Sequence, residues 1–158
     1  MRWGRAVTET TRTRERTAGP SGAAGRRHVY EFQVRFADLD PFNHVNNVRF
    51  LTHLEDARIA LLHWDRLAAG QERFGPLVVA RHEVDYKRPL TLRPEPVRIE
   101  TWVGELRRTS FTLRYEVRDD AALYLEARSV MVGYDPEGLR PRRLSAAEHA
   151  YLSGYLAG

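Results

Sequence analysis

Residues 46–70 read NNVRFLTHLEDARIALLHWDRLAAG and carry helical periodicity. Polar residues separate apolar side chains that recur every three or four positions: Phe50, Leu51, Leu54, Ala57, Leu61 and Trp64. This spacing predicts one amphipathic helix of about twenty residues that ends before Gly70. Asn46 or Asn47 is the expected N-cap, because an asparagine side chain accepts a backbone N–H of the first helical turn.

Alternating apolar and polar residues on both sides of this helix predict five β-strands. The alternation covers residues 30–36, 78–86, 97–103 and 111–117, and residues 123–134 form a fifth run that is apolar on both faces. A strand that is apolar on both faces is expected in the interior of a sheet. The short turns between the later strands imply antiparallel pairing.

A second, shorter helix is expected from Ser145 to Leu156, because Ser145 and Glu148 have the spacing of a capping box. The order of elements indicates an α+β domain at residues 28–158, in which a five-stranded antiparallel sheet packs on one long helix. Residues 1–27 are rich in Arg, Thr and Gly, lack apolar periodicity and predict a disordered extension.

The composition excludes several classes of protein. No apolar run approaches the length of a membrane span, and the absence of cysteine excludes a disulfide scaffold and a cysteine nucleophile. The net charge of +4 comes from the extension, so the rest of the chain is close to neutral. A near-neutral domain argues against a nucleic-acid partner. We expect a cytoplasmic protein.

The stretch between the first strand and the long helix, residues 35–47, reads RFADLDPFNHVNN. Two carboxylates, Asp38 and Asp40, therefore precede a helix N-terminus, which offers free backbone N–H groups and a partial positive charge. Such N–H groups can stabilise the oxyanion of acyl transfer, and a nearby carboxylate can attack the carbonyl or activate water. On these residues alone, the loop is either a catalytic site or a polar turn that caps the helix.

Other chemical signatures are absent. The chain contains no G-x-S-x-G elbow, no P-loop and no dinucleotide fingerprint. Asp38 and Asp40 begin like a calcium loop, but Phe42 stands where an oxygen ligand is required. His53 and His63 are ten residues apart on the helix, too far to share a metal ion. We expect no metal site.

Residues 36–51, followed by residues 54–58, resemble the signature of hotdog-fold acyl-CoA thioesterases of the 4-hydroxybenzoyl-CoA thioesterase type. Residues 84–90, VDYKRPL, resemble the second strand of that family, and residues 108–111 and 128–132 resemble its later strands. The similarity extends over residues 28–144. It implies the hotdog fold, with the same order of elements as the one expected from the periodicity.

The resemblance also implies a function, the hydrolysis of an acyl-CoA thioester to a free acid and coenzyme A. Asp40 matches the catalytic carboxylate of the family, which acts as a nucleophile or as a general base. His44 and Val45 match the turn whose backbone N–H polarises the thioester carbonyl. Asn47 matches an asparagine that caps the helix, and Asp38 matches a variable, structural acid.

Further residues are implied to contact the substrate. Phe42 and Tyr86 are among those whose packing sets the length of the acyl pocket, and Glu55 matches a helix acid that lies near the site in some relatives. Coenzyme A needs cations for its phosphates, and the candidates at the strand ends are Lys87, Arg88, Arg107 and Arg108, with Ser110 beside them. No cofactor or metal is implied, because coenzyme A is part of the substrate.

Two alternatives to hydrolysis remain at this point. A hotdog enoyl-CoA hydratase pairs Asp and His across four residues, whereas three residues separate Asp40 from His44. A non-catalytic acyl-CoA-binding protein is the other alternative, against which the presence of Asp40 counts. Whichever of these activities the protein has, we expect a homodimer or homotetramer. One helix covers only one face of the sheet, and the open edges of the sheet need partners.

Overall fold

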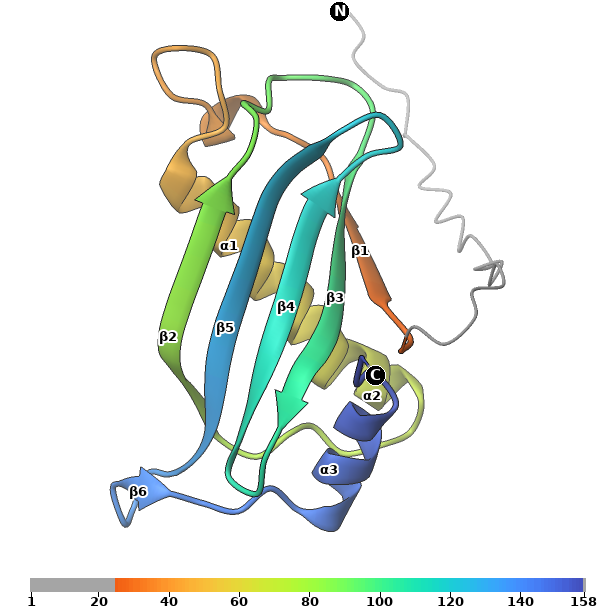
Figure 1. Ribbon diagram of the computed structural model, residues 1–158, viewed down its shortest axis with the longest axis vertical. Helices are drawn as coiled ribbons and strands as arrows, with labels where there is room; N and C mark the ends of the chain where they lie inside the picture. The colour runs from red at the N-terminus through yellow and green to blue at the C-terminus, as the bar shows by residue number, and fades with distance from the viewer. Residues whose placement is uncertain (1–24, 158) are drawn as a thin grey trace, which may run out of the picture.

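The structure, a computed structural model, describes residues 25–157, so that most of the predicted extension lies outside the described residues (Figure 1). Arg27, the last residue of that extension, contacts the domain: it pairs with Glu100 and Glu116 at 2.8 and 2.9 Å. The elements in chain order are β1 (His28–Phe32), the 3-10 helix η1 (Phe36–Asp38), α1 (Asn47–Ile59), the π-helical turn η2 (Ala60–Trp64), α2 (Asp65–Ala68), β2 (Leu77–Tyr86), β3 (Val97–Leu106), β4 (Ser110–Arg118), β5 (Leu123–Asp135), β6 (Arg140–Pro141) and α3 (Ala146–Ser153).

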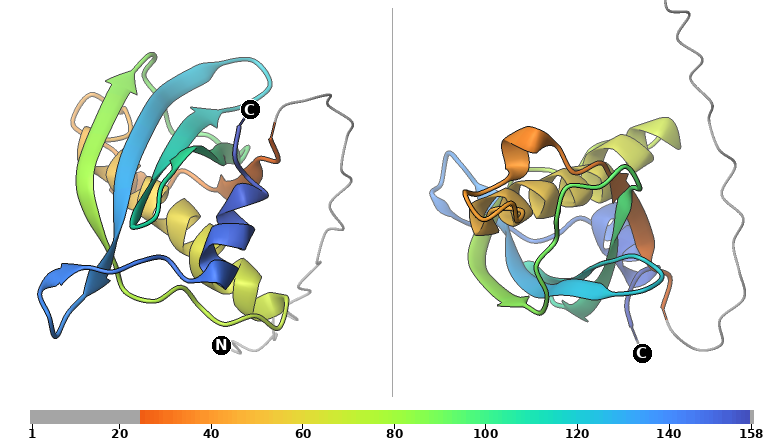
Figure 2. Two further views of the ribbon diagram at one scale, coloured as in Figure 1. Left: turned by 60° about the horizontal axis from the view of Figure 1, so that its bottom comes forward. Right: turned by 90° about the horizontal axis from the view of Figure 1, so that it is seen from above.

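One antiparallel sheet curls around the long helix (Figures 1 and 2). The strand order is β1-β3-β4-β5-β2, and the two-residue β6 pairs with the end of β5. The predicted hotdog architecture is therefore confirmed: five long antiparallel strands, one long helix and a short C-terminal helix. β5 lies inside the sheet, as its apolar composition predicts, whereas β1 and β2 are the edge strands.

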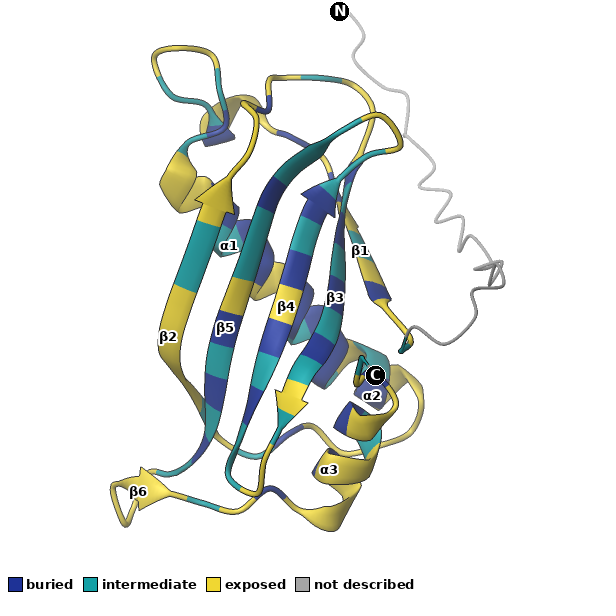
Figure 3. Cartoon of the chain, viewed as in Figure 1, coloured by how far each residue is buried: buried dark blue, intermediate teal, exposed yellow. Residues whose placement is uncertain are grey.

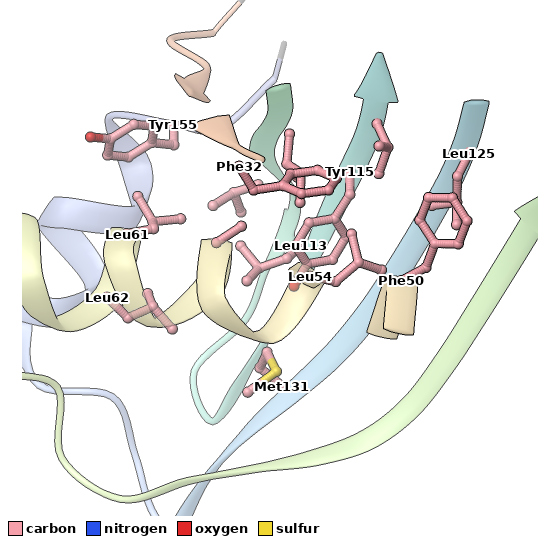
Figure 4. Packing of buried hydrophobic residues seen from close by; sticks show 14 of the residues in the cluster. Phe32, Phe50, Leu54, Leu61, Leu62, Leu113, Tyr115, Leu125, Met131 and Tyr155 are labelled. Atoms are coloured by element: carbon pink, nitrogen blue, oxygen red, sulfur yellow. The ribbon is translucent and has the colours of Figure 1, made fainter. Parts of the chain in front are cut away.

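The core lies between α1 and the concave face of the sheet (Figure 4). Alternate residues of β3 and β4 are buried there, and Leu54 and Leu61 of the helix segment are fully buried against them. Burying a side chain of this size contributes about 1.5–3 kcal/mol relative to leaving it in water. The predicted alternation of β3 and β4 is therefore what fixes the helix on this face.

The long helix runs from Asn47 to Ala68 through α1, η2 and α2 without a break, close to the predicted length. The π turn contains one more residue than an α-helical turn, so the buried face moves by one position along the sequence. Leu62 and Arg66 are buried in consequence, and Trp64 is 58% exposed. The prediction that Trp64 faces the core is wrong for this reason.

Three other elements differ from the expectation, two in where they end and one in its regularity and burial. β1 ends at Phe32, because the chain turns at Arg35, whose backbone N–H and side chain both bind Asp38; Phe36 is consequently 81% exposed. α3 begins as expected, with the reciprocal capping box of Ser145 and Glu148, but ends at Ser153. β2 has a bulge between Val79 and Arg81 and is exposed along most of its length (Figure 3).

Asn46 is the N-cap of α1, since its side chain accepts the backbone N–H of Val48 at 2.9 Å. We expect Asn46→Ala to lower the free energy of unfolding by about 1 kcal/mol, because a first-turn N–H loses its acceptor. Urea denaturation of both proteins measures the difference. Asn47→Ala is the matched control, because the Asn47 side chain forms no hydrogen bond with a described residue, and an equal loss there would contradict the assignment.

Candidate active site

The loop before α1 is a tight, hydrogen-bonded turn. The backbone N–H of Asp40 donates to the carbonyl of His44 at 2.8 Å, and the N–H of Asn43 donates to the carbonyl of Asp40 at 3.0 Å. Asn43 has a φ of 63°, in the left-handed region that asparagine tolerates better than most residues. Asparagine thus supplies the positive φ that this turn requires without a glycine.

This turn fixes one oxygen of the Asp40 carboxylate. Oδ1 accepts the backbone N–H groups of Phe42 and His44 at 2.8 and 3.1 Å. Among the described residues, no group donates a hydrogen bond to Oδ2 or forms an ion pair with it. Asp40 is half-buried, so this second oxygen is available to a substrate or to a water molecule.

The backbone donors that the resemblance assigned to the carbonyl are both occupied. The N–H of His44 binds the Asp40 carboxylate, and the N–H of Val45 donates to the carbonyl of Leu90 at 2.7 Å. Asn47 has the available donor: it is the first residue of α1 and exposed, and its N–H meets no acceptor among the described residues. The cap itself is Asn46, so the prediction of Asn47 as the capping residue is wrong.

Asp38 is held away from solvent, 1% exposed, by partners on two sides. The Arg35 backbone N–H and guanidinium both donate to its carboxylate, and Nε2 of His53 lies 3.4 Å from Oδ2. Burial alone raises the pKa of Asp38, but the hydrogen bonds from Arg35 outweigh burial and keep that pKa below its ordinary value. Asp38 therefore has a structural role, because it links the start of this loop to Arg35 and to His53 of the helix.

Tyr86 joins the end of β2 to the start of the helix. Its hydroxyl donates to the carbonyl of Asn47 at 3.0 Å, and its ring meets the edge of Phe50. Phe42, whose backbone N–H binds the Asp40 carboxylate, has a side chain that is 79% exposed. The structure thus brings Phe42 and Tyr86 to the same end of the molecule as Asp40.

The two cations that follow β2 lie at this end as well. Nζ of Lys87 pairs with Glu126 at 2.8 Å, whereas the exposed Arg88 side chain has no ion pair with a described residue. Arg88 is therefore the better placed of the two for a phosphate group.

Three of the predicted binding residues are at the opposite end of the sheet. Arg107, Arg108 and Ser110 belong to the β3–β4 hairpin, and the register of β1 on β3 places that hairpin away from the loop of Asp40 (Figure 1). Arg107 pairs with Glu105 at 2.7 Å. Within one subunit, these three residues are not brought together with Asp40.

Glu55 belongs to a polar cluster that the sequence pattern did not reveal. Its carboxylate pairs with Arg58, a largely buried cation of α1, at 3.2 Å. On the sheet, His82 of β2 forms a hydrogen bond with its register partner, the buried Ser129 of the adjacent strand β5, at 2.7 Å. Burial, and then Arg58, lower the pKa of His82.

A groove of about 730 Å³ begins at Glu55 and Arg58 and continues between the helix and the start of β2. Its floor is apolar and includes Leu62, Val79 and Met131. One feature of the sequence could have indicated this cluster. Arg58, a cation, stands next to Ala57 where the predicted helix turns its apolar face to the core.

Comparison with known proteins gives the family. A sequence model described as the thioesterase-like superfamily matches residues 34–149. The chain belongs to this thioesterase-like superfamily. The resemblance to hotdog-fold thioesterases that the sequence indicated is thereby confirmed. The prediction of a thioester hydrolase is confirmed at the level of the family. No curated protein matches significantly.

Solved structures of similar fold include proteins described as thioesterases. A thioesterase from Thermus thermophilus, in complex with coenzyme A and zinc, is 32% identical over 80% of this chain and 92% of its own, with a TM-score of 0.66. A protein from Bacillus stearothermophilus described as a predicted thioesterase is 22% identical over 83% and 97%, with a TM-score of 0.71. An aspartate-to-asparagine variant of 4-hydroxybenzoyl-CoA thioesterase, bound to 4-hydroxybenzoyl-CoA, is 19% identical over 80% and 99%, with a TM-score of 0.68.

Two observations on residues 25–157 complete the description of this superfamily member. No helix in that range is long and apolar enough to cross a membrane. Nor do three histidine or acidic side chains there converge in the manner of a metal site.

Proposed function

We propose that this protein hydrolyses an acyl-CoA thioester, with Asp40 as the catalytic carboxylate and the N-terminus of α1 as the oxyanion site. The observation that supports it is the state of Asp40: one carboxylate oxygen is fixed by two backbone N–H groups and the other is available. A fixed carboxylate, in the loop that leads into a helix with a free first-turn N–H, supplies the two groups that acyl transfer requires.

The reaction follows from these two groups. The N–H of Asn47 donates to the thioester carbonyl oxygen, which becomes negative as the tetrahedral species forms, and the helix dipole favours that charge. Oδ2 of Asp40 either attacks the carbonyl carbon or takes a proton from the water that attacks it. If Oδ2 attacks, the carbon–sulfur bond breaks to leave an acyl anhydride on Asp40 and the thiolate of coenzyme A, and water then hydrolyses the anhydride to release the acid and a proton for the thiolate. If Oδ2 acts as a base, the water oxygen bonds to the carbonyl carbon, the carbon–sulfur bond breaks, and the proton taken by Asp40 passes to the coenzyme thiolate as the acid is released.

Coenzyme A is the leaving group, and its phosphates need cations. Arg88 follows β2 at the same end of the sheet as Asp40 and has no competing carboxylate among the described residues. Arg88 is therefore the first contact of this subunit for the coenzyme, and Lys87 contributes after it releases Glu126.

A second copy of the chain completes the site. β2 is an edge strand with Val78 and Val79 partly exposed, and an open edge of this kind pairs with another strand. Two copies that pair antiparallel along β2 place the β3–β4 hairpin of one copy at the Asp40 end of the other. Arg107, Arg108 and Ser110 then serve the site of the partner subunit.

We therefore expect at least a dimer in solution. Light scattering at micromolar concentration should give at least twice the chain mass of 18.3 kDa. A monomer of 18.3 kDa with full hydrolytic activity would contradict both the dimer and the shared site.

The hydrolysis itself is tested with a panel of acyl-CoA thioesters that spans aliphatic chain lengths and includes aromatic acyl groups. Release of the free thiol measures turnover. We expect turnover of at least one member that is lost in the Asp40→Asn protein. Binding of acyl-CoA without any turnover would instead assign the protein as a non-catalytic acyl-CoA-binding member of the superfamily.

A further inference from the structure

An open pocket of about 990 Å³ lies between α2, the loop at residues 69–76 and α3. Arg66, Arg73, Arg142, Ser145 and Tyr151 contribute to its wall. Figures 1 and 2 show that this region is at the far end of the long helix from the loop that carries Asp40. A helix of this length measures roughly 33 Å, so the pocket is separate from the proposed active site of the same subunit.

Arg66 is the unusual residue of this pocket. It is 4% exposed, and its guanidinium carbon lies 4.8 Å from the ring centre of Phe74 and 4.7 Å from that of Tyr151. Its Nε donates to the carbonyl of Glu72 at 2.7 Å. Its two Nη atoms form no hydrogen bond or ion pair with a described residue. A buried guanidinium is ordinarily paired with an anion.

The acidic groups near the pocket do not supply that anion. Glu148 binds both Nη atoms of Arg142 at 2.8 Å, and Asp65 binds His28 at 3.0 Å. Glu72 offers its backbone carbonyl to Arg66, and its exposed side chain forms no ion pair with a described residue.

Arg73 and Arg66 also lie close enough to His63 on the helix to affect the pKa of its imidazole. Burial lowers the pKa of His63, and Arg73 and Arg66 lower that pKa further. The cations of this region are thus only partly compensated.

We propose that this pocket binds a phosphate monoester, with the two Nη atoms of Arg66 as a bidentate donor to two phosphate oxygens. The bond to Glu72 and the two rings fix the plane of the guanidinium and leave its Nη edge for a ligand. That edge matches the spacing of phosphate oxygens. Arg73 supplies a second positive charge for the dianion, and the volume is in the range of small-molecule sites.

The experiment titrates the full chain with inorganic phosphate by calorimetry, against chloride at equal ionic strength. We expect saturable binding of phosphate with a Kd of about 1 mM or tighter. In Arg66→Met the affinity should fall at least tenfold. Arg66→Lys should be several-fold weaker than the parent, because an ammonium lacks the planar fork. An equal response to phosphate and chloride, or unchanged binding by Arg66→Met, would overturn the proposal.

A second pair of variants avoids the stacked arginine. Ala150 is exposed on α3 and contributes to the pocket wall, whereas the exposed Ala146 on the same helix does not. Ala150→Glu places a carboxylate in the pocket and should abolish phosphate binding, and Ala146→Glu should retain it. Loss of binding in both variants or in neither would count against this location.

Coenzyme A and 3′-dephospho-coenzyme A identify the source of the phosphate. A difference in their affinities that Arg66→Met removes assigns the site to the 3′-phosphate of the coenzyme. Equal affinities, together with phosphate binding, assign it to a separate phosphorylated metabolite. The Asp40→Asn protein should bind phosphate like the parent, so the test is independent of the hydrolysis assay.

Discussion

Asp40→Asn should lower kcat for acyl-CoA hydrolysis by about a hundredfold or more, with fold and oligomeric state unchanged. The amide oxygen of asparagine can still accept the N–H groups of Phe42 and His44, so the turn keeps its shape. What is lost is the negative charge on the second oxygen, which the proposed mechanism uses to attack the carbonyl or to take the proton. Steady-state kinetics measure the loss, and circular dichroism and light scattering confirm the fold and the assembly.

Asp38→Asn is the matched control, two residues away. Asp38 has the same chemistry but is buried with Arg35 and His53, so its substitution should cost about 2 kcal/mol of stability and much less in rate. Hydrolysis by Asp40→Asn at near the parental rate would refute the catalytic assignment. So would a rate loss in Asp38→Asn as large as that in Asp40→Asn.

Glu148→Gln should lower the free energy of unfolding by about 3 kcal/mol, the size of loss expected when one partner of a buried ion pair is removed. Glu148 is 4% exposed and accepts four hydrogen bonds, two from Arg142 and one each from the backbone N–H groups of Gly75 and Ser145. For a domain of this size, the melting temperature should fall by roughly 10 °C. Glu137→Gln, in an exposed turn, is the control and should leave Tm unchanged.

This effect should depend on pH. Burial raises the pKa of Glu148, but Arg142 and the two backbone N–H groups outweigh burial and lower that pKa to about 2 from an ordinary value of 4.5. Between these values the unfolded chain binds more protons, so the stabilisation is complete above pH 4.5 and declines as the pH falls towards 2. The Tm difference between the parent and Glu148→Gln should narrow over that interval, and a constant difference would contradict the assignment.

The elements predicted well from the sequence are those whose local pattern agrees with their final environment. β3 and β4 alternate strictly because they lie in the middle of the sheet with one face on the helix. The capping box of α3 is a local device, so its two residues suffice to place the start of the helix. β2 was predicted as a half-buried strand, but a sequence does not show that a strand is an edge with both faces open.

The candidate site was predicted in part. The loop, its carboxylates and the following helix are local in sequence, and the structure brings Asp40, Phe42 and Tyr86 to one end of the molecule. Which backbone N–H is free depends on a distant residue, since Leu90 occupies the N–H of Val45. No spacing rule contains that information. The sequence likewise does not show that Arg66 is buried without an anionic partner among the described residues. That depends on how α3 packs against α2.

The π turn at residues 60–64 contains one residue more than an α-helical turn of the same length would need. Elsewhere in a helix, removing one residue rotates everything that follows by about 100°. Within the turn, the loss of one residue is absorbed by a return to regular geometry, and both flanking halves keep their orientation. The half of the helix that begins at the proposed oxyanion site and the half that carries Arg66 therefore keep their orientations when the turn loses a residue. Residues 60–64 are therefore the position in this helix where one residue can be lost without disturbing either end.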